Sequence, residues 1–497
     1  MIDTKKTFAA IDKSIDETKG ILKKEEVSTV RSIAAGTAIV TGLKNAEIDE
    51  LLEFSNGVLG MVQTLNEDSV GVVFLDNPEK VKAGERVRRT GRVLDVPVGT
   101  ELLGRVINPV GRVLDNKAQM ECHERRKIEV EAVSIMDREP VEVPLQTGIK
   151  AIDSFAPIGR GQRELILGDR QTGKTAIALD TIINQKGNGV ICIYCAIGQR
   201  NSAIAGVIAD LEKYGVMPQT IVVSAAADDE AGMQFIAPYA ATSIGEYFMQ
   251  QGRDVLVVYD DLTNHARAYR QMSLLLRRPP GREAFPGDIF YIHSRLLERA
   301  TNLSQELGGG SLTALPIVST EAGNISAYIP TNIISITDGQ IYLSAQMFQK
   351  GLMPAMDIGR SVSRVGGDAQ LPAYKSVVGP LKLFYAQFEE LESFTKFGTQ
   401  LDADTQKRIE RGQAIRLVLE QRQFQTLSAP EQIAVFVAAN NGLFDGMAAP
   451  ENKKSQEIVL ETFRLRFHKS ADKILQRQKL TPKDIETMVE TFKKALQ

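Results

Sequence analysis

GDRQTGKT, at residues 168–175, fits the phosphate-binding loop pattern G-x-x-x-x-G-K-[ST]. The apolar run ELILGD at 164–169 precedes it and is typical of a buried strand, and helical spacing starts at Lys174. In a strand–loop–helix unit of this kind, the loop N–H groups close around a β-phosphate and the helix N-terminus adds partial positive charge. The stretch therefore predicts a nucleotide site. It leaves open whether this chain hydrolyses the nucleotide or only holds it.

Every residue of this loop is predicted to contact the nucleotide. Lys174 is expected to reach the β- and γ-phosphate oxygens, and the Thr175 hydroxyl is expected to ligate Mg²⁺. A second magnesium residue is predicted at Asp260, because DVLVVYDD at 254–261 places it at the end of an apolar run. The alternative is a solvated Asp-Asp turn. The predicted nucleotide-binding residues of the loop are Gly168, Asp169, Arg170, Gln171, Thr172, Gly173, Lys174 and Thr175.

Hydrolysis needs a further group, a carboxylate that polarises the attacking water. That group is expected just beyond the strand next to the phosphate loop, where the sequence reads CAIGQRNS and places Gln199. An amide can orient a water molecule but takes up a proton very poorly. The sequence therefore predicts a site that binds Mg-nucleotide at Gln199 and Asp260 without hydrolysing it. The alternative is a surface glutamine with the base elsewhere.

Around this site the chain is predicted to form a multidomain α/β protein. Strands and helices alternate over 92–370, which predicts a central RecA-like P-loop nucleotide-binding domain with a parallel sheet. Short β-type runs over 25–91 predict an N-terminal six-stranded β-barrel. Long segments of helical period over 371–497 predict a C-terminal α-helical bundle. Residues 1–24 predict an amphipathic helix that docks either on a partner or on the chain's own body.

Composition limits the classes of function. The formal net charge of -3, with 43% hydrophobic and 24% charged residues, is that of a soluble globular protein and argues against a general affinity for nucleic acid or acidic membranes. No apolar run reaches the roughly 18 residues of a membrane span, so membrane attachment is expected only through partners. The N-terminus resembles neither a secretion signal nor a mitochondrial presequence. Cys192 and Cys195 lie within one predicted strand and are expected in the core.

Four stretches together resemble one family, the alpha subunits of the catalytic head of the rotary F-type ATP synthase. They are GDRQTGKT, RRPPGREAFPGDIFYIHSRLLERA (277–300), AYIPTNIISITDGQIYL (327–343) and SVSRVGGDAQ (361–370). The resemblance implies a ring of three alpha and three beta subunits around a gamma shaft, in which the alpha sites bind ATP or ADP with Mg²⁺ but are not catalytic. It also implies synthesis of ATP from ADP and phosphate, driven by a transmembrane ion gradient of protons or sodium.

The resemblance also implies partners and a location. A delta-type stalk subunit would contact the N-terminal helix, and the loop RRPPGREAFPGD would form part of the bearing around gamma. The expected location is peripheral, on the cytoplasmic face of a bacterial cell membrane, with an organellar inner or thylakoid membrane as the alternative. No nucleic acid is expected as a partner.

Several single residues match functional positions of the family. Arg364 matches the arginine finger that reaches the γ-phosphate on the adjacent beta subunit, and Ser361 matches a position lining that interface, as does Ser335. Gln421 and Gln423 match the segment that touches the adenine base, with Phe424 placed to stack on it. These roles are implied by the resemblance alone.

At one position the chain departs from the family. Met353, before Pro354, stands where the family usually has arginine, which removes a planar cation from the expected base site.

Two other classes of function compete with this interpretation. A ring-shaped nucleic-acid helicase would share the nucleotide core but would need a carboxylate base and a basic or aromatic surface, and Gln199 and the net charge of -3 oppose it. A nucleotide-binding assembly protein with no part in turnover would have no use for Arg364.

Overall fold

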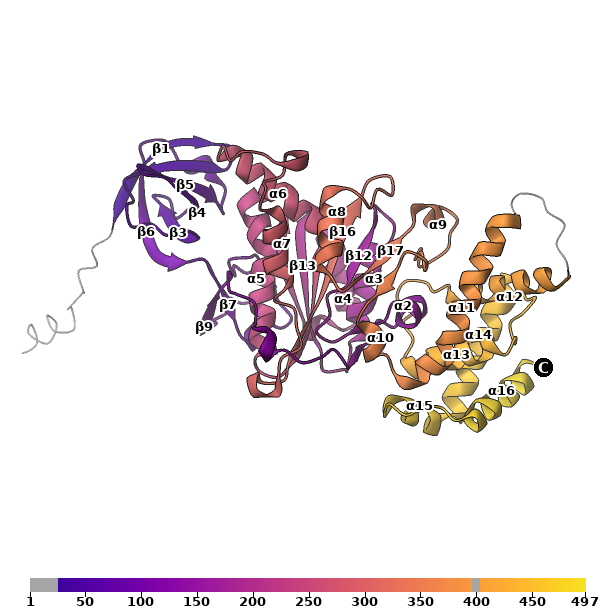
Figure 1. The fold of residues 1–497 in the computed structure, drawn as a ribbon. Coiled ribbons are helices and arrows are strands. Elements are labelled where there is room, and N and C mark those ends of the chain that lie inside the picture. The colour runs from indigo at the N-terminus through magenta and orange to yellow at the C-terminus, as the bar shows by residue number, and fades with distance from the viewer. Residues whose placement is uncertain (1–25, 396–402) are drawn as a thin grey trace, which may run out of the picture. The chain divides into compact units, whose positions relative to one another are not determined.

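The computed structural model describes residues 26–395 and 403–497 (Figure 1). The chain divides into two compact units, Met1–Leu94 and Asp95–Gln497, each with its own hydrophobic core. The amphipathic helix expected within residues 1–24 lies outside the described residues. Among the helices of the described ranges, none combines the length and the apolar character that a membrane span requires.

The first unit contains a closed barrel of six antiparallel strands in the order β1-β2-β5-β4-β3-β6, which confirms the predicted six-stranded barrel. Its interior is apolar, and the rings of Phe54 and Phe74 lie 4.9 Å apart there. Glu50 is buried but paired, because Arg89 donates to its carboxylate at 2.9 Å. The strands are β1 (Val27–Ala34), β2 (Thr37–Thr41), β3 (Glu50–Phe54), β4 (Leu59–Leu65), β5 (Ser69–Phe74) and β6 (Arg86–Val93).

The second unit is built on an eight-stranded sheet in the order β18-β17-β12-β16-β15-β13-β14-β8. Every pairing in it is parallel except that between β17 and β18. Strands β13 and β14 bury nearly all their side chains, as expected for a parallel sheet covered on both faces. The strands are β8 (Val106–Ile107), β12 (Leu165–Asp169), β13 (Ile191–Gln199), β14 (Thr220–Ala226), β15 (Asp254–Asp260), β16 (Ser311–Thr320), β17 (Gly339–Leu343) and β18 (Val362–Ser363).

Helices cover both faces of this sheet (Figure 1). Helices α3 and α4 share one apolar cluster with sheet residues such as Cys192 and Leu256. Helix α5 approaches the opposite face at Gly245, where an added Cβ would lie 2.7 Å from Leu312. Cys192 and Cys195 are both buried free thiols, as predicted. The helices are α3 (Lys174–Asn184), α4 (Asn201–Lys213), α5 (Ala231–Met249), α6 (Leu262–Leu275), α7 (Ile289–Leu297) and α8 (Tyr328–Ile336).

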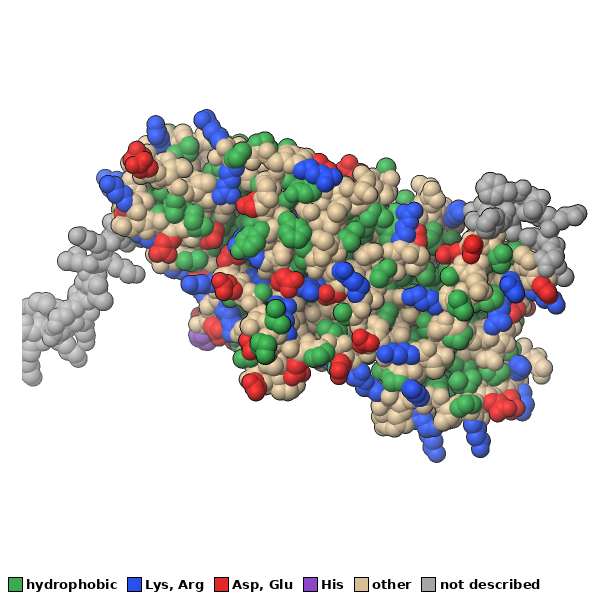
Figure 2. Space-filling model, viewed as in Figure 1, with side chains coloured by type: hydrophobic (Ala, Val, Ile, Leu, Met, Phe, Trp, Pro, Cys, Tyr) green, Lys and Arg blue, Asp and Glu red, His purple; other side chains and the backbone are tan. Residues whose placement is uncertain are grey.

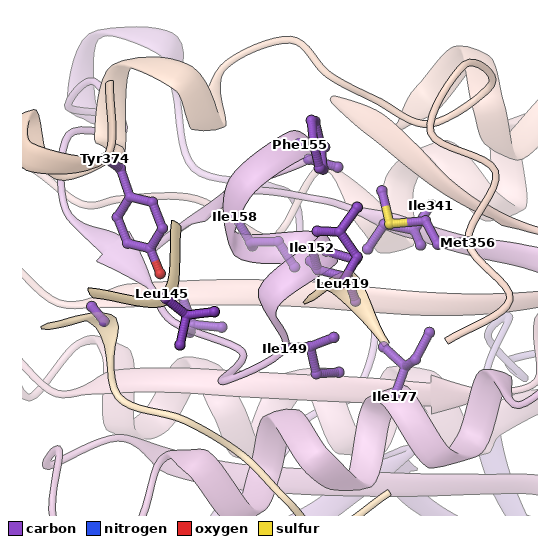
Figure 3. Packing of buried hydrophobic residues seen from close by; sticks show 14 of the residues in the cluster. Leu145, Ile149, Ile152, Phe155, Ile158, Ile177, Ile341, Met356, Tyr374 and Leu419 are labelled. Atoms are coloured by element: carbon purple, nitrogen blue, oxygen red, sulfur yellow. The ribbon is translucent and has the colours of Figure 1, made fainter. Parts of the chain in front are cut away.

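A short helix, α2, joins this sheet to the C-terminal helices. Figure 3 shows its residues Ile152 and Phe155 within one cluster that also holds Tyr374 and Leu419. The cluster extends from the sheet into the helical bundle, so the two regions share a single core. The remaining short elements are β7 (Asp95–Val98) paired with β9 (Glu124–Lys127), β10 (Pro144–Leu145) paired with β11 (Ile158–Gly159), α2 (Lys150–Phe155), α9 (Ala345–Gln349) and α10 (Gly366–Ala369).

The predicted C-terminal bundle is confirmed, with helix α13 at its centre. Ten of the twelve residues of α13 are buried, and the helix contacts α11, α12, α14, α15 and α16. Capping boxes at Ser428 and Thr481 begin α13 and α16, because the carboxylates of Glu431 and Asp484 accept hydrogen bonds from the backbone N–H groups of the two cap residues. The helices are α11 (Pro372–Thr395), α12 (Ala403–Leu419), α13 (Ala429–Asn440), α14 (Ala449–Arg466), α15 (His468–Leu475) and α16 (Pro482–Leu496).

Charged side chains of both signs are interspersed on the face shown in Figure 2. This distribution agrees with the formal net charge of -3. That face therefore presents no broad field of a single sign to a charged polymer.

Candidate functional site: a nucleotide cavity

The phosphate loop links strand β12 to helix α3, and its shape depends on two glycines. A Cβ at Gly168 would lie 2.7 Å from the carbonyl oxygen of Leu343 on the neighbouring strand, so only glycine fits there. Gly173, with φ of 97°, begins the helix in the left-handed region that glycine adopts without strain. The loop is also held from within, since Thr172 Oγ1 donates to Asp169 O at 2.8 Å.

Asp169 braces the loop from its other side. Its carboxylate accepts hydrogen bonds from Thr320 Oγ1 and from the Gly323 N–H. Arg170 and Gln171 are exposed at the tip. Within the predicted set, Asp169 and Thr172 therefore shape the loop, while its tip is open to a ligand.

Lys174 is the cation of the loop. Its side chain is buried, and its ammonium donates to the carbonyl oxygens of Gly168 at 2.9 Å and Asp169 at 2.5 Å. Burial lowers the pKa of Lys174, and the nearby carboxylates of Asp261 and Asp260 oppose that shift. An arriving phosphate would add negative charge to that already supplied by the carbonyl dipoles and the nearby aspartates.

Asp260 lies at the end of strand β15, facing the start of helix α3. Thr175 Oγ1 donates to its Oδ2 at 2.7 Å, and the Tyr194 hydroxyl donates to the same oxygen at 2.8 Å. Burial raises the pKa of Asp260, and the adjacent Asp261 carboxylate raises it further. Hydroxyl and carboxylate oxygens are the ligands Mg²⁺ prefers, and these two oxygens already lie together, so they fit the predicted metal pair.

Gln199 ends strand β13 beside this carboxylate. Its Nε2 donates to Asp260 Oδ1 at 3.0 Å. The parallel register that pairs Ala196 with Asp260 brings the two strand ends together. An amide donor here gives Asp260 a hydrogen-bond partner, whereas a carboxylate would place a second negative charge beside it.

A cavity of about 550 Å³ extends from the phosphate loop toward the C-terminal helices. Beyond the phosphate loop, its lining combines the apolar residues Ile149, Phe348, Met353 and Pro354 with the polar residues Gln421, Arg422 and Gln423. Such a surface suits the flat face of a base. The lining residues are Ile149, Gln171, Thr172, Gly173, Lys174, Thr175, Ala176, Ile177, Asp180, Phe348, Met353, Pro354, Ala355, Gln421, Arg422 and Gln423.

The polar side chains at this end differ in whether their hydrogen-bonding groups already have partners within the chain. The Gln421 amide is already engaged, because its oxygen accepts from the Lys150 N–H at 2.9 Å and its nitrogen donates to Gly148 O at 2.7 Å. Gln423 is exposed, and its side chain makes no hydrogen bond within the described residues. Phe424 differs from the expectation, since it does not line the cavity and instead stacks on Tyr214 with ring centroids 4.6 Å apart.

Comparison with known proteins covers nearly the whole chain. The family model described as "ATP synthase alpha/beta family, nucleotide-binding domain" matches residues 148–363, the β-barrel domain model matches 24–91 and the C-terminal domain model matches 370–495. The chain belongs to the ATP synthase alpha/beta family. The resemblance to its alpha subunits, expected from the four quoted stretches, is confirmed.

Relatives within the family are similar over almost their full length. "ATP synthase subunit alpha 2" of Syntrophus aciditrophicus (strain SB) is 54% identical over 490 residues, which are 99% of this chain and 94% of that protein. "ATP synthase subunit alpha 1" of Marinomonas sp. (strain MWYL1) is 55% identical over 490 residues, 99% of this chain and 96% of that protein. "ATP synthase subunit alpha 1" of Chlorobium luteolum has the same identity and coverage.

In this member of the family, Arg364 and Ser361 belong neither to the cavity lining nor to the cluster of side chains around Asp260. Arg364 is exposed at the end of the short strand β18, where its guanidinium donates to Thr337 O and its N–H donates to Asp338 O at 2.9 Å. Ser361 is buried, with its hydroxyl donating to Asp357 O at 2.6 Å and accepting from the Tyr342 N–H. The Ser361 side chain therefore supports β17, while the Arg364 side chain is at the surface.

Three residues in or beside the site were not predicted from the sequence. The Tyr194 hydroxyl hydrogen-bonds Asp260. Its position two residues before Ala196 could have indicated this, because strand residues two apart point to the same face of the sheet. Asp180 lies four residues after Ala176 and three after Ile177, which also line the cavity, and this helical spacing could have indicated it. Tyr214 ends α4, and no pattern in its neighbourhood connects it to Phe424.

Proposed function

We propose that this chain is the non-catalytic, nucleotide-binding alpha subunit of an ATP synthase head, which lends Arg364 to the reaction of a neighbouring beta subunit. The observation that carries the proposal is the side chain beside Asp260. Where a hydrolytic site needs a proton acceptor, Gln199 presents an amide that donates to Asp260 Oδ1 at 3.0 Å.

In the chain's own site, the loop from Gly168 to Thr175 would hold the phosphates of ATP or ADP through its N–H groups and Lys174. Mg²⁺, when bound, neutralises phosphate charge, and the Thr175 hydroxyl and Asp260 carboxylate would hold it. Gln199 can orient a water molecule but cannot take its proton. The site would therefore retain nucleotide without turning it over.

Arg364 would act outside this chain. Its guanidinium bonds a neutral carbonyl oxygen and forms no salt bridge within the described residues, so its charge is available to a partner. A guanidinium placed on a transferred phosphoryl group neutralises the charge that develops there, which is worth about 10³ to 10⁵ in rate in comparable hydrolases. Ser361, fixed against Tyr342, would hold the segment that carries the arginine.

The proposal extends to the assembly. Three copies would alternate with three beta subunits around a gamma shaft, with residues 1–24 contacting a delta-type stalk subunit. The proposed domain boundaries are 25–91 for the β-barrel, 92–370 for the nucleotide-binding domain and 371–497 for the helical domain. The head would lie on the cytoplasmic face of a bacterial membrane, attached only through partner subunits, and the complex would make ATP from ADP and phosphate using an ion gradient. The family match and the alpha-subunit relatives support this assignment.

The test compares two arginines four residues apart. In a reconstituted complex, Arg364→Ala is expected to lower ATP turnover by about 10³-fold or more while this chain still binds nucleotide. The control is Arg360→Ala, because Arg360 is also exposed but pairs with Asp357. Equal turnover of the two variants would remove the finger assignment. Rapid ATP hydrolysis by the highly purified chain alone would refute the non-catalytic site.

A further inference from the structure

The segment between α12 and α13 crosses the apolar end of the nucleotide cavity and is fixed at both of its ends. At one end, the Gln421 N–H donates to Met353 O at 2.8 Å, and the Gln421 side chain bonds the backbone at Gly148 and Lys150. Between the ends, Arg422 and Gln423 line the cavity with exposed side chains. Those two side chains can meet a base only if the backbone beneath them is held in place.

The other end is held by Phe424, in an unfavourable backbone conformation. Its φ of 66° lies in the left-handed region, which is uncommon for a bulky residue without a compensating contact. Two groups supply such contacts, one polar and one aromatic, and they come from different elements of the nucleotide domain.

The polar contact comes from Asp180. Its Oδ1 accepts the Phe424 N–H at 2.9 Å, and the side chain is almost fully buried on helix α3. This helix begins with Lys174, so the phosphate end and the base end of the cavity are joined by one rigid element of 11 residues. Within the described residues, the N–H of Phe424 is the hydrogen-bond donor found for this carboxylate.

The aromatic contact comes from Tyr214 at the end of α4. The Phe424 and Tyr214 rings are stacked at 27°, and the Lys213 ammonium lies 5.4 Å from the centroid of the Tyr214 ring. Neither ring lines the cavity. Stacked rings of this kind contribute beyond the area they bury, so this contact can hold Phe424 without touching a ligand.

We propose that Asp180 and Phe424 are positioning residues that hold Arg422 and Gln423 over the base, so that this pair sets the affinity of the site for the base but not for the phosphates. The inference rests on the proposed function, since it requires that the cavity binds a nucleotide. It assigns Phe424 a role different from direct stacking on the base, because its ring is already occupied by Tyr214.

The experiment measures binding of two probes to the full-length chain at pH 8 with Mg²⁺: ATP, and tripolyphosphate, which has no base. Burial raises the pKa of Asp180 to about 6, so pH 8 keeps its carboxylate ionised. Asp180→Ala removes the acceptor for Phe424 and is expected to weaken ATP binding roughly 10- to 100-fold, the loss typical of a hydrogen bond to a charged group. Tripolyphosphate binding should stay within about twofold of wild type.

Matched variants separate positioning from direct contact. Asp180→Asn keeps a carbonyl oxygen for the Phe424 N–H and is expected to retain most ATP affinity, and Phe424→Tyr keeps the stacked ring and should behave in the same way. Phe424→Leu and Tyr214→Leu lose the stack and should each weaken ATP by roughly 3- to 10-fold with no effect on tripolyphosphate. Thermal unfolding of each variant identifies any that fail to fold, and Tyr214→Leu, remote from the cavity, then stands in for them.

Three outcomes would overturn the proposal. If Asp180→Asn loses as much ATP affinity as Asp180→Ala, the carboxylate contacts the base directly. If the variants weaken both probes equally, the pair only supports the fold. If ATP affinity is unchanged in Asp180→Ala and Tyr214→Leu, the segment needs no such support. Failure of the wild-type chain to bind either probe would instead refute the proposed function.

Discussion

Replacing Gln199 by glutamate would place a second carboxylate against Asp260. In the structure the Gln199 amide donates to Asp260 Oδ1 at 3.0 Å, while Thr175 and Tyr194 donate to Oδ2. Glutamate is nearly isosteric with glutamine, so its oxygen would occupy the position of the donor. The variant therefore tests whether the amide stabilises the buried Asp260 carboxylate by its hydrogen bond, in addition to leaving the site without a general base.

The loss of unfolding free energy can be calculated from this distance. Two unit charges about 3 Å apart repel by roughly 5 kcal/mol at an effective dielectric constant of about 20. Protonation limits the penalty, because neutralising a glutamate with an unfolded-state pKa of about 4.3 costs about 3.7 kcal/mol at pH 7. The neutral carboxyl can still donate to Asp260, so the hydrogen bond survives. The expected loss of unfolding free energy is therefore about 3 to 4 kcal/mol at pH 7.

The loss must depend on pH with a definite sign. The introduced carboxyl has its pKa raised in the folded state, so the folded protein binds more protons than the unfolded chain. Its contribution to stability then falls by about 1.4 kcal/mol per pH unit above pH 4.3, until the raised pKa is reached. Burial also raises the pKa of Asp260, and the two carboxyls titrate as a pair.

Urea unfolding of the full-length chain at pH 6.0 and pH 7.5, in EDTA and in Mg-ADP, measures this effect. In EDTA, Gln199→Glu is expected to lose about 2 kcal/mol more at pH 7.5 than at pH 6.0. In Mg-ADP much of the loss should be recovered, because a divalent cation screens the two carboxylates. The exposed Gln251→Glu is the charge control, and Gln199→Ala removes the donor without adding charge. A pH-independent loss equal to that of Gln199→Ala would refute the reasoning.

Three other substitutions are expected to have distinct effects. Lys174→Gln should weaken Mg-ATP binding to this chain by roughly 10- to 100-fold, measured by equilibrium titration, while a reconstituted complex keeps most of its turnover; equal loss of both would mark this site as catalytic. Arg299→Met should cost about 3–5 kcal/mol in urea unfolding, because it leaves the buried Glu246 carboxylate, now bonded at 2.6 Å, without its cation; the double variant with Glu246→Leu should recover part of that loss. Burial raises the pKa of Asp153 to about 6, so the wild type loses about 1 kcal/mol of stability from this group between pH 5 and pH 7.5, and Asp153→Asn should remove that component of the urea-measured pH dependence.

The parts of the site that depend on local pattern could be predicted from the sequence. The phosphate loop is a contiguous motif, and Asp260 and Gln199 each end an apolar run, so their types and positions indicated a shared edge of the sheet. The structure confirms that they meet, because Thr175 donates to Asp260 and the Asp260 charge acts on the adjacent Lys174. Short-range regularity was sufficient because parallel strands end at the same edge.

The parts that depend on distant contacts could not be predicted. Asp180 and Phe424 are 244 residues apart in the chain, and their hydrogen bond exists only because the helical bundle shares a core with the sheet. An aromatic residue next to two glutamines fits a base-stacking role and an anchoring role equally well in sequence. The stack on Tyr214 distinguishes these two roles and favours the anchoring role. It depends on the backbone reversal at Phe424, which residue types alone do not predict.

A nucleotide that is held without being hydrolysed acts on this chain as a structural ligand. Its effect is then thermodynamic, since a ligand at 100 times its dissociation constant stabilises the bound form by about 2.7 kcal/mol. That free energy stabilises the relative arrangement of the elements that the nucleotide contacts. Here the phosphate loop and Asp180 share helix α3, while Gln421 and Gln423 belong to the segment that enters the bundle. Occupancy of the cavity would therefore favour one arrangement of the helical bundle on the nucleotide domain. The same core includes α11, which is separated from the segment bearing Arg364 only by the short helix α10. The site proposed to be non-catalytic would thus have a physical route to the arginine proposed to act on the neighbouring subunit.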